Sequence, residues 1–262
     1  MKKRKVAAMT ALLAFMAVSL AVTAVQLLQF KRTVAFASAE ASGAGIPVLC
    51  YHSIADNGGS NEYVVSPERF REEMAWLSGQ GYHSIDLKEF GALLSGKEKP
   101  SGKEVLITFD DGYENNYAEA LPVLEEYGFR ATEFLVTNWV GGAGYLSWDE
   151  VKALRGAGWD IMAHTRTHPF LPLHTASVQR DEIAGSKAAI ERELGTEVTA
   201  LAYPYGLRSE ETMRLVKQSG YAYAFTFDDG WTDPGQNPYL LKRLFISGGM
   251  GLNDFERKLM HG

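Results

Sequence analysis

Two groups of residues in this 262-residue chain have the types and spacing that metal chemistry needs. Asp110 and Asp111 stand side by side after an apolar run, and two carboxylates directed into one space repel each other unless a cation lies beside them. His164 and His168 follow a second apolar run, and their spacing lets both imidazoles reach one ion. A catalytic zinc site uses three protein ligands and keeps a fourth position open. One aspartate with the two histidines therefore fills the ligand count of a divalent-metal site, with zinc as the first choice.

Each group also has an ordinary structural explanation. The aspartate pair alone could form a turn in which one carboxylate caps the following helix. The two histidines alone could be polar loop residues. The presence of both groups in one chain favours the metal site. The ion itself is not determined, because the same ligands accept zinc, cobalt, nickel or iron.

The rest of the chain predicts alternating strands and helices. Short β-rich apolar runs indicate strands at residues 46–51, 104–109, 131–136, 159–163, 198–203 and 222–227. Helical spacing and capping residues indicate helices at residues 66–79, 86–94, 116–127, 147–157, 178–194 and 209–219. This alternation calls for a mostly parallel α/β sheet, either open or closed, and we favour a distorted (β/α) barrel. In both architectures the chemistry gathers at the carboxyl ends of the strands, where both polar groups lie.

The amino-terminal segment has the pattern of an export signal. Basic residues at positions 2–5 precede the uncharged run 6–28, and the positive-inside rule then places the remainder outside the cytoplasm. The run is long enough to span a bilayer of about 30 Å, which favours a retained membrane anchor. The small residues at 35–39 would instead suit cleavage as a signal peptide. We expect a signal anchor or signal peptide over residues 1–37, a linker over 38–45 and a catalytic domain over 46–262, either anchored at the membrane or secreted to the cell surface.

Charge and cysteine content narrow the function classes. Residues 1–37 hold six basic residues and no acidic ones, so the remainder carries 20 basic residues against 32 acidic ones. Nucleic acid is not expected as a partner, because binding a phosphate backbone requires clustered basic residues. Cys50 is the only cysteine, which excludes an intramolecular disulfide and a cysteine-rich metal site. We expect a monomer whose fold rests on packing.

Three motifs together resemble the polysaccharide deacetylase family, also known as carbohydrate esterase family 4 or the NodB-homology domain. They are Thr108-Phe109-Asp110-Asp111-Gly112, His164-Thr165-Arg166-Thr167-His168 and Tyr203-Pro204-Tyr205-Gly206. Their order and their placement after strands make the resemblance specific, and it covers roughly residues 46–250. It implies a distorted β/α barrel and hydrolysis of an N-acetyl amide on a sugar polymer.

The resemblance also implies roles for single residues. Asp111, His164 and His168 become the metal ligands, and Asp110 becomes the general base that takes a proton from the attacking water. The division is reasonable, because a carboxylate bound to an ion is occupied as a ligand while its neighbour remains free to move a proton. The backbone N–H of Tyr205 would help to stabilise the tetrahedral oxyanion.

The chain departs from the family pattern at two places. The arginine that usually precedes the third motif and holds the base is Ala202 here, and Arg243 is a candidate replacement, although an ordinary surface arginine would give the same pattern. The late Leu-x-His motif that supplies the general acid is absent. Leu49-Cys50-Tyr51-His52-Ser53 instead resembles the branch acting on poly-N-acetylglucosamine, in which the acid motif is moved to the amino-terminal end. His52 then becomes the general acid, and its ordinary pKa of about 6.5 suits that task. A hydrogen-bonded histidine at a strand end is the alternative.

A second aspartate motif, Thr226-Phe227-Asp228-Asp229-Gly230, lacks a following histidine pair. Asp229 and Trp231 from this segment, with Pro204 and Tyr205, are candidates for contact with sugar. A plain turn explains the second motif equally well.

We therefore expect a metal-dependent enzyme that removes acetyl groups from N-acetylglucosamine residues of a surface polysaccharide such as poly-N-acetylglucosamine. Peptidoglycan is the nearest alternative substrate. A protein of another class, an inactive glycan-binding descendant, is disfavoured because it has no use for a free carboxylate beside a metal site.

Overall fold

The computed structural model describes residues 45–56 and 61–261. The predicted signal segment at residues 1–37 and all but the last residue of the predicted linker lie outside this part. The described residues form one compact unit. Within the described residues, no helix has the length and apolar character needed to cross a membrane.

A ring of seven parallel strands forms the centre of the described chain. The strands are β1 (Val48–Tyr51), β5 (Glu104–Asp111), β6 (Thr132–Leu135), β7 (Asp160–Ala163), β8 (Ala200–Ala202), β9 (Tyr223–Asp229) and β10 (Leu241–Phe245). Each pairs with the next in chain order, and β1 closes the ring by pairing with both β5 and β10. The prediction of a (β/α) barrel is therefore confirmed, and the open sheet is excluded.

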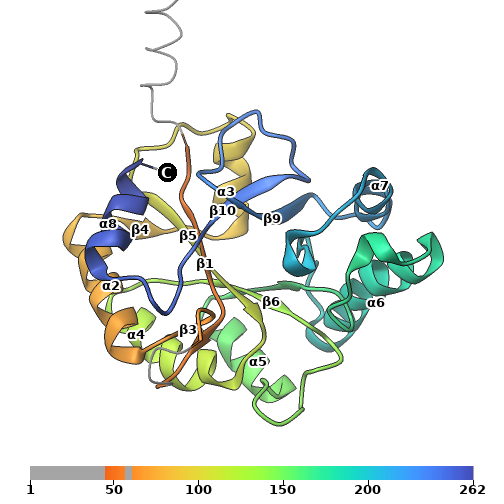
Figure 1. Ribbon diagram of the computed structural model, residues 1–262, viewed down its shortest axis with the longest axis horizontal. Helices are drawn as coiled ribbons and strands as arrows, with labels where there is room; N and C mark the ends of the chain where they lie inside the picture. Colours follow the sequence, from red (N-terminus) through yellow and green to blue (C-terminus); the bar gives the residue numbers. More distant parts are fainter. Residues whose placement is uncertain (1–44, 57–60, 262) are drawn as a thin grey trace, which may run out of the picture. The chain divides into compact units, whose positions relative to one another are not determined.

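Helices surround this ring on the outside (Figure 1). They are α2 (Pro67–Gly79), α4 (Leu121–Glu126), α5 (Trp148–Gly156), α6 (Ala176–Leu194), α7 (Glu210–Gln218) and α8 (Leu252–His261). Most begin at a side chain that accepts a hydrogen bond from the backbone N–H three residues on, as Ser66, Ser147, Thr175 and Ser209 do. Such caps satisfy backbone donors that the first helical turn leaves unpaired.

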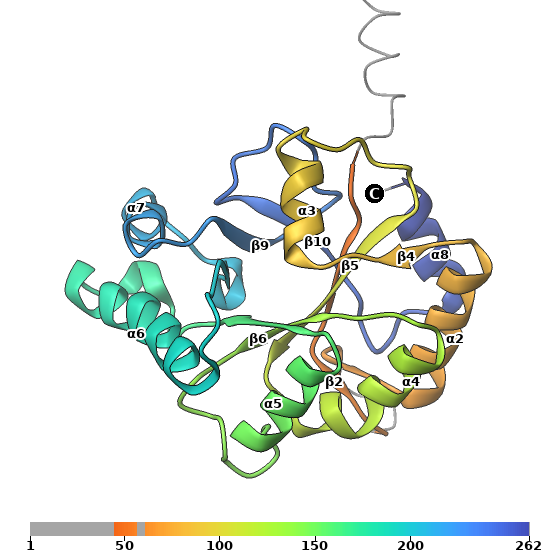
Figure 2. The same cartoon turned by 180° about the vertical axis from the view of Figure 1, so that it is seen from behind.

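The short helix α3 (Leu87–Leu94) lies at the amino ends of the strands, beside β9 (Figure 2). The backbone N–H of Leu87 donates to the carboxylate of Asp160, the first residue of β7, at 2.8 Å. The Phe90 ring lies 5.9 Å from that of Tyr223, the first residue of β9. Since α3 covers this end of the ring, the opposite end, where the strands finish, is the one open for a site.

The structure departs from the predicted elements at several places. The predicted helix at 116–127 is a π-helical turn, η1 (Asn116–Ala120), followed by α4, because Pro122 has no N–H for the regular helical ladder. Two short strand pairings were not predicted: β4 (His83–Ser84) pairs in parallel with the first residues of β5, and β2 (Ser53–Ile54) pairs with β3 (Val64–Val65). The segment around Arg243 was also not predicted as a strand, and it forms β10.

One buried acid outside the barrel should make stability depend on pH. Glu73 on α2 is fully buried and accepts a hydrogen bond of 2.8 Å from the Tyr51 hydroxyl. Burial raises the pKa of Glu73 to about 8. The folded state therefore binds one more proton here than the unfolded state does between about pH 4.5 and pH 8, so the free energy of unfolding falls as pH rises through that window, by at most about 1.4 kcal/mol per pH unit.

Replacing Glu73 with Gln should remove this contribution. We expect urea unfolding at pH 5 and at pH 8 to differ less in Glu73→Gln than in the unaltered protein. Equal pH dependence in the two proteins would contradict the assignment.

Candidate active site

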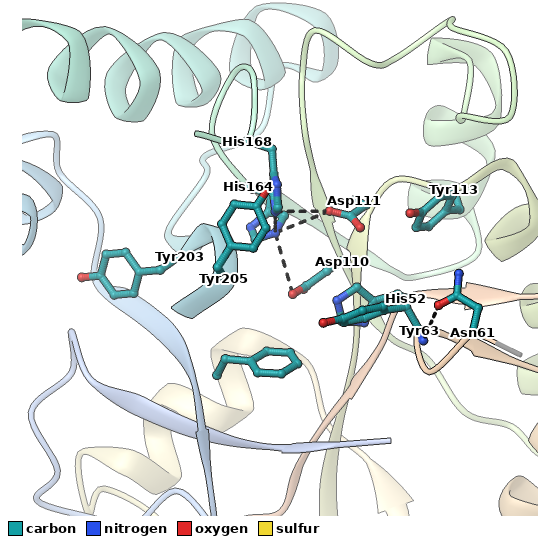
Figure 3. Close-up of a pocket in the computed structure, with 11 residues that line it drawn as sticks. His52, Asn61, Tyr63, Asp110, Asp111, Tyr113, His164, His168, Tyr203 and Tyr205 are labelled. Atoms are coloured by element: carbon teal, nitrogen blue, oxygen red, sulfur yellow. Dashed lines mark hydrogen bonds and ion pairs between the residues drawn. The ribbon is translucent and has the colours of Figure 1, made fainter. Parts of the chain in front are cut away.

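The candidate residues meet at the carboxyl ends of the strands, around a cavity of about 290 Å³ (Figure 3). β5 ends in the aspartate pair, β7 leads into the histidine motif, and His52 follows β1 directly. The cavity is lined by His52, Asn61, Tyr63, Asp110, Asp111, Tyr113, His164, His168, Tyr203, Tyr205 and Phe227. Motifs more than a hundred residues apart in sequence thus share one cavity, because parallel strands finish at the same end of a barrel.

Asp111, His164 and His168 converge as a candidate metal site. Their ligand atoms all lie within 4.8 Å of one another. The two Nε2 atoms are 3.1 Å apart, and each lies 3.6 Å from Oδ1 of Asp111. His164 Nδ1 faces the carbonyl of Ala202 at 2.8 Å and donates to it, which leaves Nε2 with the free lone pair that a metal needs.

The electrostatics of these three residues fit a cation. Burial lowers the pKa of His164 to about 4 and that of His168 to about 3, so both imidazoles are neutral, as metal binding requires. Burial, followed by the charge of Asp110, raises the pKa of Asp111 to about 7. Its Oδ1 is buried and has no hydrogen-bond partner among the described residues. A divalent cation would satisfy this oxygen, and the residues present therefore fit the group.

The loop that carries His168 is held by α6. Glu182 accepts hydrogen bonds from the backbone N–H groups of Arg166 and Thr167, both at 2.9 Å, and from the Thr167 hydroxyl at 2.7 Å. The Thr165 hydroxyl accepts from the N–H of His168 at 3.1 Å. Both Thr165 and His168 have positive φ angles, 67° and 60°, which non-glycine residues adopt only where their surroundings hold them.

Asp110 is held in an ion pair with Arg243. The guanidinium donates to both carboxylate oxygens at 2.7 Å, and both side chains are almost fully buried. Arg243 is itself fixed by donating from Nε to the Thr226 carbonyl at 3.0 Å. Burial alone would raise the pKa of Asp110, but the Arg243 guanidinium holds it well below its usual range. The carboxylate is therefore ionised and rigidly oriented.

His52 lies on the other side of Asp110, packed among aromatic rings. Its ring is 5.0 Å from Tyr63, 6.0 Å from Phe227 and 5.8 Å from Phe245. Burial lowers the pKa of His52 to about 4, so the imidazole is neutral near pH 7 and must gain a proton before it can donate one. A ring nitrogen of His52 lies within 4.8 Å of both the Asp110 carboxylate and the Cys50 thiol.

Cys50, His52 and Asp110 could in principle form a second metal site. The Cys50 thiol lies 3.7 Å from Oδ2 of Asp110 as a weak hydrogen-bond donor. A cation there would approach the guanidinium that already occupies both Asp110 oxygens, and the two positive charges would repel. Of the two groups, the one around Asp111 is the better metal site.

Tyr205 lies at the rim of the cavity, half exposed. It is in a short 3₁₀ turn, η3 (Pro204–Gly206), with a positive φ of 58°. Its ring stacks on Phe170, with centroids 4.3 Å apart, and contacts the His168 ring at 4.4 Å. Pro204, the first residue of this turn, is buried and does not line the cavity.

The other two sugar-contact candidates lie away from the cavity wall. Asp229 pairs with Lys258 of α8 at 2.7 Å. Trp231 is half-buried and packs close to Gly45. From the second aspartate motif it is Phe227 that lines the cavity. Neither Phe227 nor the pair Asn61 and Tyr63 was predicted, since no spacing pattern in the sequence marks them.

The fold and site define a class of protein: a β/α barrel whose strand ends carry a buried, arginine-held carboxylate beside a histidine–aspartate cluster. The chain matches the family model described as polysaccharide deacetylase over residues 97–224. It is 36% identical over 212 residues to YxkH of Bacillus subtilis, which is named for the same family, with 81% of this chain and 75% of that protein covered. The chain belongs to the polysaccharide deacetylase family, and the predicted family and enzyme class, an N-deacetylase, are confirmed.

The similarity to further relatives supports the predicted branch of the family, the one that resembles deacetylases of poly-N-acetylglucosamine. The chain is 30% identical to the poly-beta-1,6-N-acetyl-D-glucosamine N-deacetylase of Staphylococcus epidermidis, covering 71% of this chain and 68% of that one. Among solved structures, the deacetylase PplD of Streptococcus pyogenes superposes with a TM-score of 0.78 at 27% identity, covering 82% of this chain and 98% of PplD. IcaB from Ammonifex degensii gives a TM-score of 0.75 at 25% identity, covering 83% and 97%.

Proposed function

We propose that this polysaccharide deacetylase is a metal-dependent enzyme that removes N-acetyl groups from a poly-β-1,6-N-acetylglucosamine polymer outside the cytoplasm. The observation that carries the proposal is the position of His52, at the end of the first barrel strand and next to Asp110. An imidazole beside the carboxylate supports a general-acid role for His52 in a chain that lacks the late histidine motif. The named activity of the staphylococcal relatives supports the choice of polymer.

Asp111, His164 and His168 would hold the metal, with zinc as the first choice. A divalent cation bound there supplies Lewis acidity toward the acetyl carbonyl and makes water a better nucleophile. The neutral imidazoles and the unpartnered Asp111 oxygen support this assignment.

Asp110 acts as the general base in this proposal. It takes a proton from water as the water oxygen bonds to the acetyl carbon, and Arg243 keeps the carboxylate ionised and oriented. The proton then passes to His52, which has a ring nitrogen within 4.8 Å of the Asp110 carboxylate. His52 then gives it to the amine nitrogen as the carbon–nitrogen bond breaks, and acetate and a free amino sugar leave.

In this proposal, the rim of the cavity stabilises the oxyanion and binds the sugar. The backbone N–H of Tyr205 donates to the oxyanion, and the exposed Tyr205 edge contacts the sugar. The basic and apolar amino-terminal segment supports export, either as a membrane anchor or as a cleaved signal.

A substrate panel tests the choice of polymer. A chain starting near Ser38, loaded with zinc, would be given oligomers of β-1,6-linked N-acetylglucosamine, β-1,4-linked chitin oligomers and peptidoglycan, and released amine would be measured. We expect the highest kcat/KM on the β-1,6 oligomers. A higher kcat/KM on peptidoglycan would contradict the proposed substrate but not the proposed deacetylation reaction. No amine release from any of the three substrates would favour the glycan-binding alternative.

A further inference from the structure

The second aspartate motif, at residues 226–230, lies at the end of strand β9, beside the site. The Thr226 carbonyl accepts a hydrogen bond from Nε of Arg243 at 3.0 Å, and Phe227 lines the cavity. Asp228 comes next in the chain, and its side chain is about half exposed. The proposed reaction gives this carboxylate no task, so its contacts need another explanation.

The contacts of Asp228 run through Arg208 to the turn η3. Nη1 of Arg208 donates to Oδ1 of Asp228 at 3.0 Å, and Nη2 donates to Oδ2. Nη1 also donates to the carbonyl oxygen of Gly206 at 2.9 Å. A guanidinium that binds both oxygens of one carboxylate has a fixed orientation. Asp228 therefore directs Arg208 onto the backbone of the turn.

The turn has a backbone conformation that needs support. Tyr205 and Gly206 have consecutive positive φ angles, 58° and 67°. Glycine adopts such angles readily, whereas tyrosine does so at a cost. A Cβ atom on Gly206 would lie 2.7 Å from the backbone nitrogen of Phe227 and 2.6 Å from its Cβ. The turn thus packs closely against the end of β9 on one side, and Arg208 holds its carbonyl.

This turn also carries the group proposed to stabilise the oxyanion. The Tyr205 ring lies next to that of His168, with centroids 4.4 Å apart (Figure 3). The N–H of Tyr205 and the carbonyl of Gly206 belong to the same three-residue turn. An anchor on the carbonyl therefore limits rotation of the backbone that carries the N–H. Oxyanion stabilisation depends on donors that are fixed in place before the reaction.

We propose that Asp228 and Arg208 are positioning residues for η3: Asp228 holds the Arg208 guanidinium on the Gly206 carbonyl, and this contact fixes the backbone of Tyr205. The consequence for catalysis rests on the oxyanion role proposed for the Tyr205 N–H. The consequence for the backbone does not depend on it. Partly exposed ion pairs contribute little to global stability, so the effect is expected in the turn and not in the melting temperature.

Two variants break the contact from its two ends, and a third is the matched control. Arg208→Met removes every hydrogen bond of the guanidinium, and Asp228→Ala removes the carboxylate that orients it. Lys258→Met removes the cation that pairs with Asp229, the other aspartate of the same motif, at 2.7 Å. The side chains of Lys258 and Arg208 are similarly exposed, 22% and 25%, so the two Met substitutions are comparable.

Three measurements separate positioning from general support. The first is residue-specific amide exchange by NMR in metal-free protein. The amides of Gly206 and Leu207 donate to the carbonyls of Tyr203 and Pro204 at 2.8 and 3.0 Å, so their exchange reports on the turn. The second is kcat and KM of the zinc-loaded protein on β-1,6-linked N-acetylglucosamine oligomers. The third is melting temperature.

For Arg208→Met we expect faster exchange of the Gly206 and Leu207 amides with little change in melting temperature. We expect kcat to fall by about 10- to 100-fold, because the donor is misplaced; outright loss of an oxyanion donor costs about 10²- to 10³-fold. KM should stay within about twofold, since the interaction forms only in the transition state. Asp228→Ala should shift exchange and kcat in the same direction, and Lys258→Met should match the unaltered protein.

Three outcomes would overturn the proposal. The first is unchanged exchange of the two amides in Arg208→Met and Asp228→Ala. The second is exchange accelerated equally across the whole chain, which indicates general destabilisation. The third is a raised KM at unchanged kcat, which would mean that Arg208 binds the polymer itself.

The same measurements distinguish a failure of the proposed function. Faster exchange of the turn with unchanged kcat and KM would support the anchoring of the turn and contradict the oxyanion role of Tyr205. No amine release by the unaltered protein would contradict the proposed deacetylation, and the exchange of the two amides would still decide whether Asp228 and Arg208 hold the turn.

Discussion

Asp110→Asn should lower kcat for acetyl release by about 10²- to 10⁴-fold, the range typical for loss of a general base. Asparagine keeps the shape of the side chain but cannot take a proton from water. The cluster of Asp111, His164 and His168 is left intact, so zinc affinity should stay within about threefold of the original, well below the change expected from losing a ligand-orienting partner. Stability should fall to some extent, because Arg243 keeps its buried charge and loses the opposite one.

The variant must therefore be assayed at a temperature where it is folded, which circular dichroism establishes. His83→Gln is a suitable control, since His83 is exposed on β4 and takes no part in the cavity. Retention of more than about half of the original kcat by Asp110→Asn would rule out Asp110 as the base.

Arg243→Met should lower the free energy of unfolding by about 3–5 kcal/mol, the cost of leaving one member of a buried ion pair alone. The Asp110 carboxylate would then be buried without a cation. Within the described chain, its Oδ2 would keep the weak contact with the Cys50 thiol at 3.7 Å and the neutral His164 imidazole at 3.9 Å. Burial would raise its pKa, and a protonated Asp110 cannot act as a base. We therefore expect a loss of kcat together with the loss of stability.

A double-mutant cycle measures how far the two side chains depend on each other. Arg243→Met with Asp110→Asn removes both buried charges, so the double variant should be more stable than Arg243→Met alone. Urea unfolding midpoints of the four proteins give the coupling energy. Simple additivity of the two single changes would contradict an energetically important ion pair.

The sequence was sufficient to predict the site residues that lie in short motifs at the ends of strands. Asp110, Asp111, His164 and His168 could be placed together because parallel strands finish at one end of a barrel. The contact of Arg243 with Asp110 was suggested only by the missing arginine at Ala202. Its geometry depends on β10 closing the ring between β1 and β9, which no local pattern in the segment reveals.

Residues that act through tertiary contacts could not be found in the same way. Glu182 occurs in a helix where its neighbours in sequence give no reason to expect burial. Tyr63 reaches the cavity from a loop between two short strands. Conversely, Asp229 and Trp231 were predicted to contact sugar because they lie in or next to a second copy of the aspartate motif. In the structure, Asp229 pairs with Lys258 of α8, Trp231 is partly buried, and neither lines the cavity.

The most direct test of the central claim is acetate release from β-1,6-linked N-acetylglucosamine oligomers by one protein preparation in three states: as purified, stripped by a chelator, and stripped with zinc restored. We expect release to disappear on stripping and to return with about one zinc per chain, the stoichiometry of a single catalytic site. His168→Ala, treated identically, should not recover. Full activity of the stripped protein, with no zinc remaining by metal analysis, would contradict a metal-dependent deacetylase built on Asp111, His164 and His168.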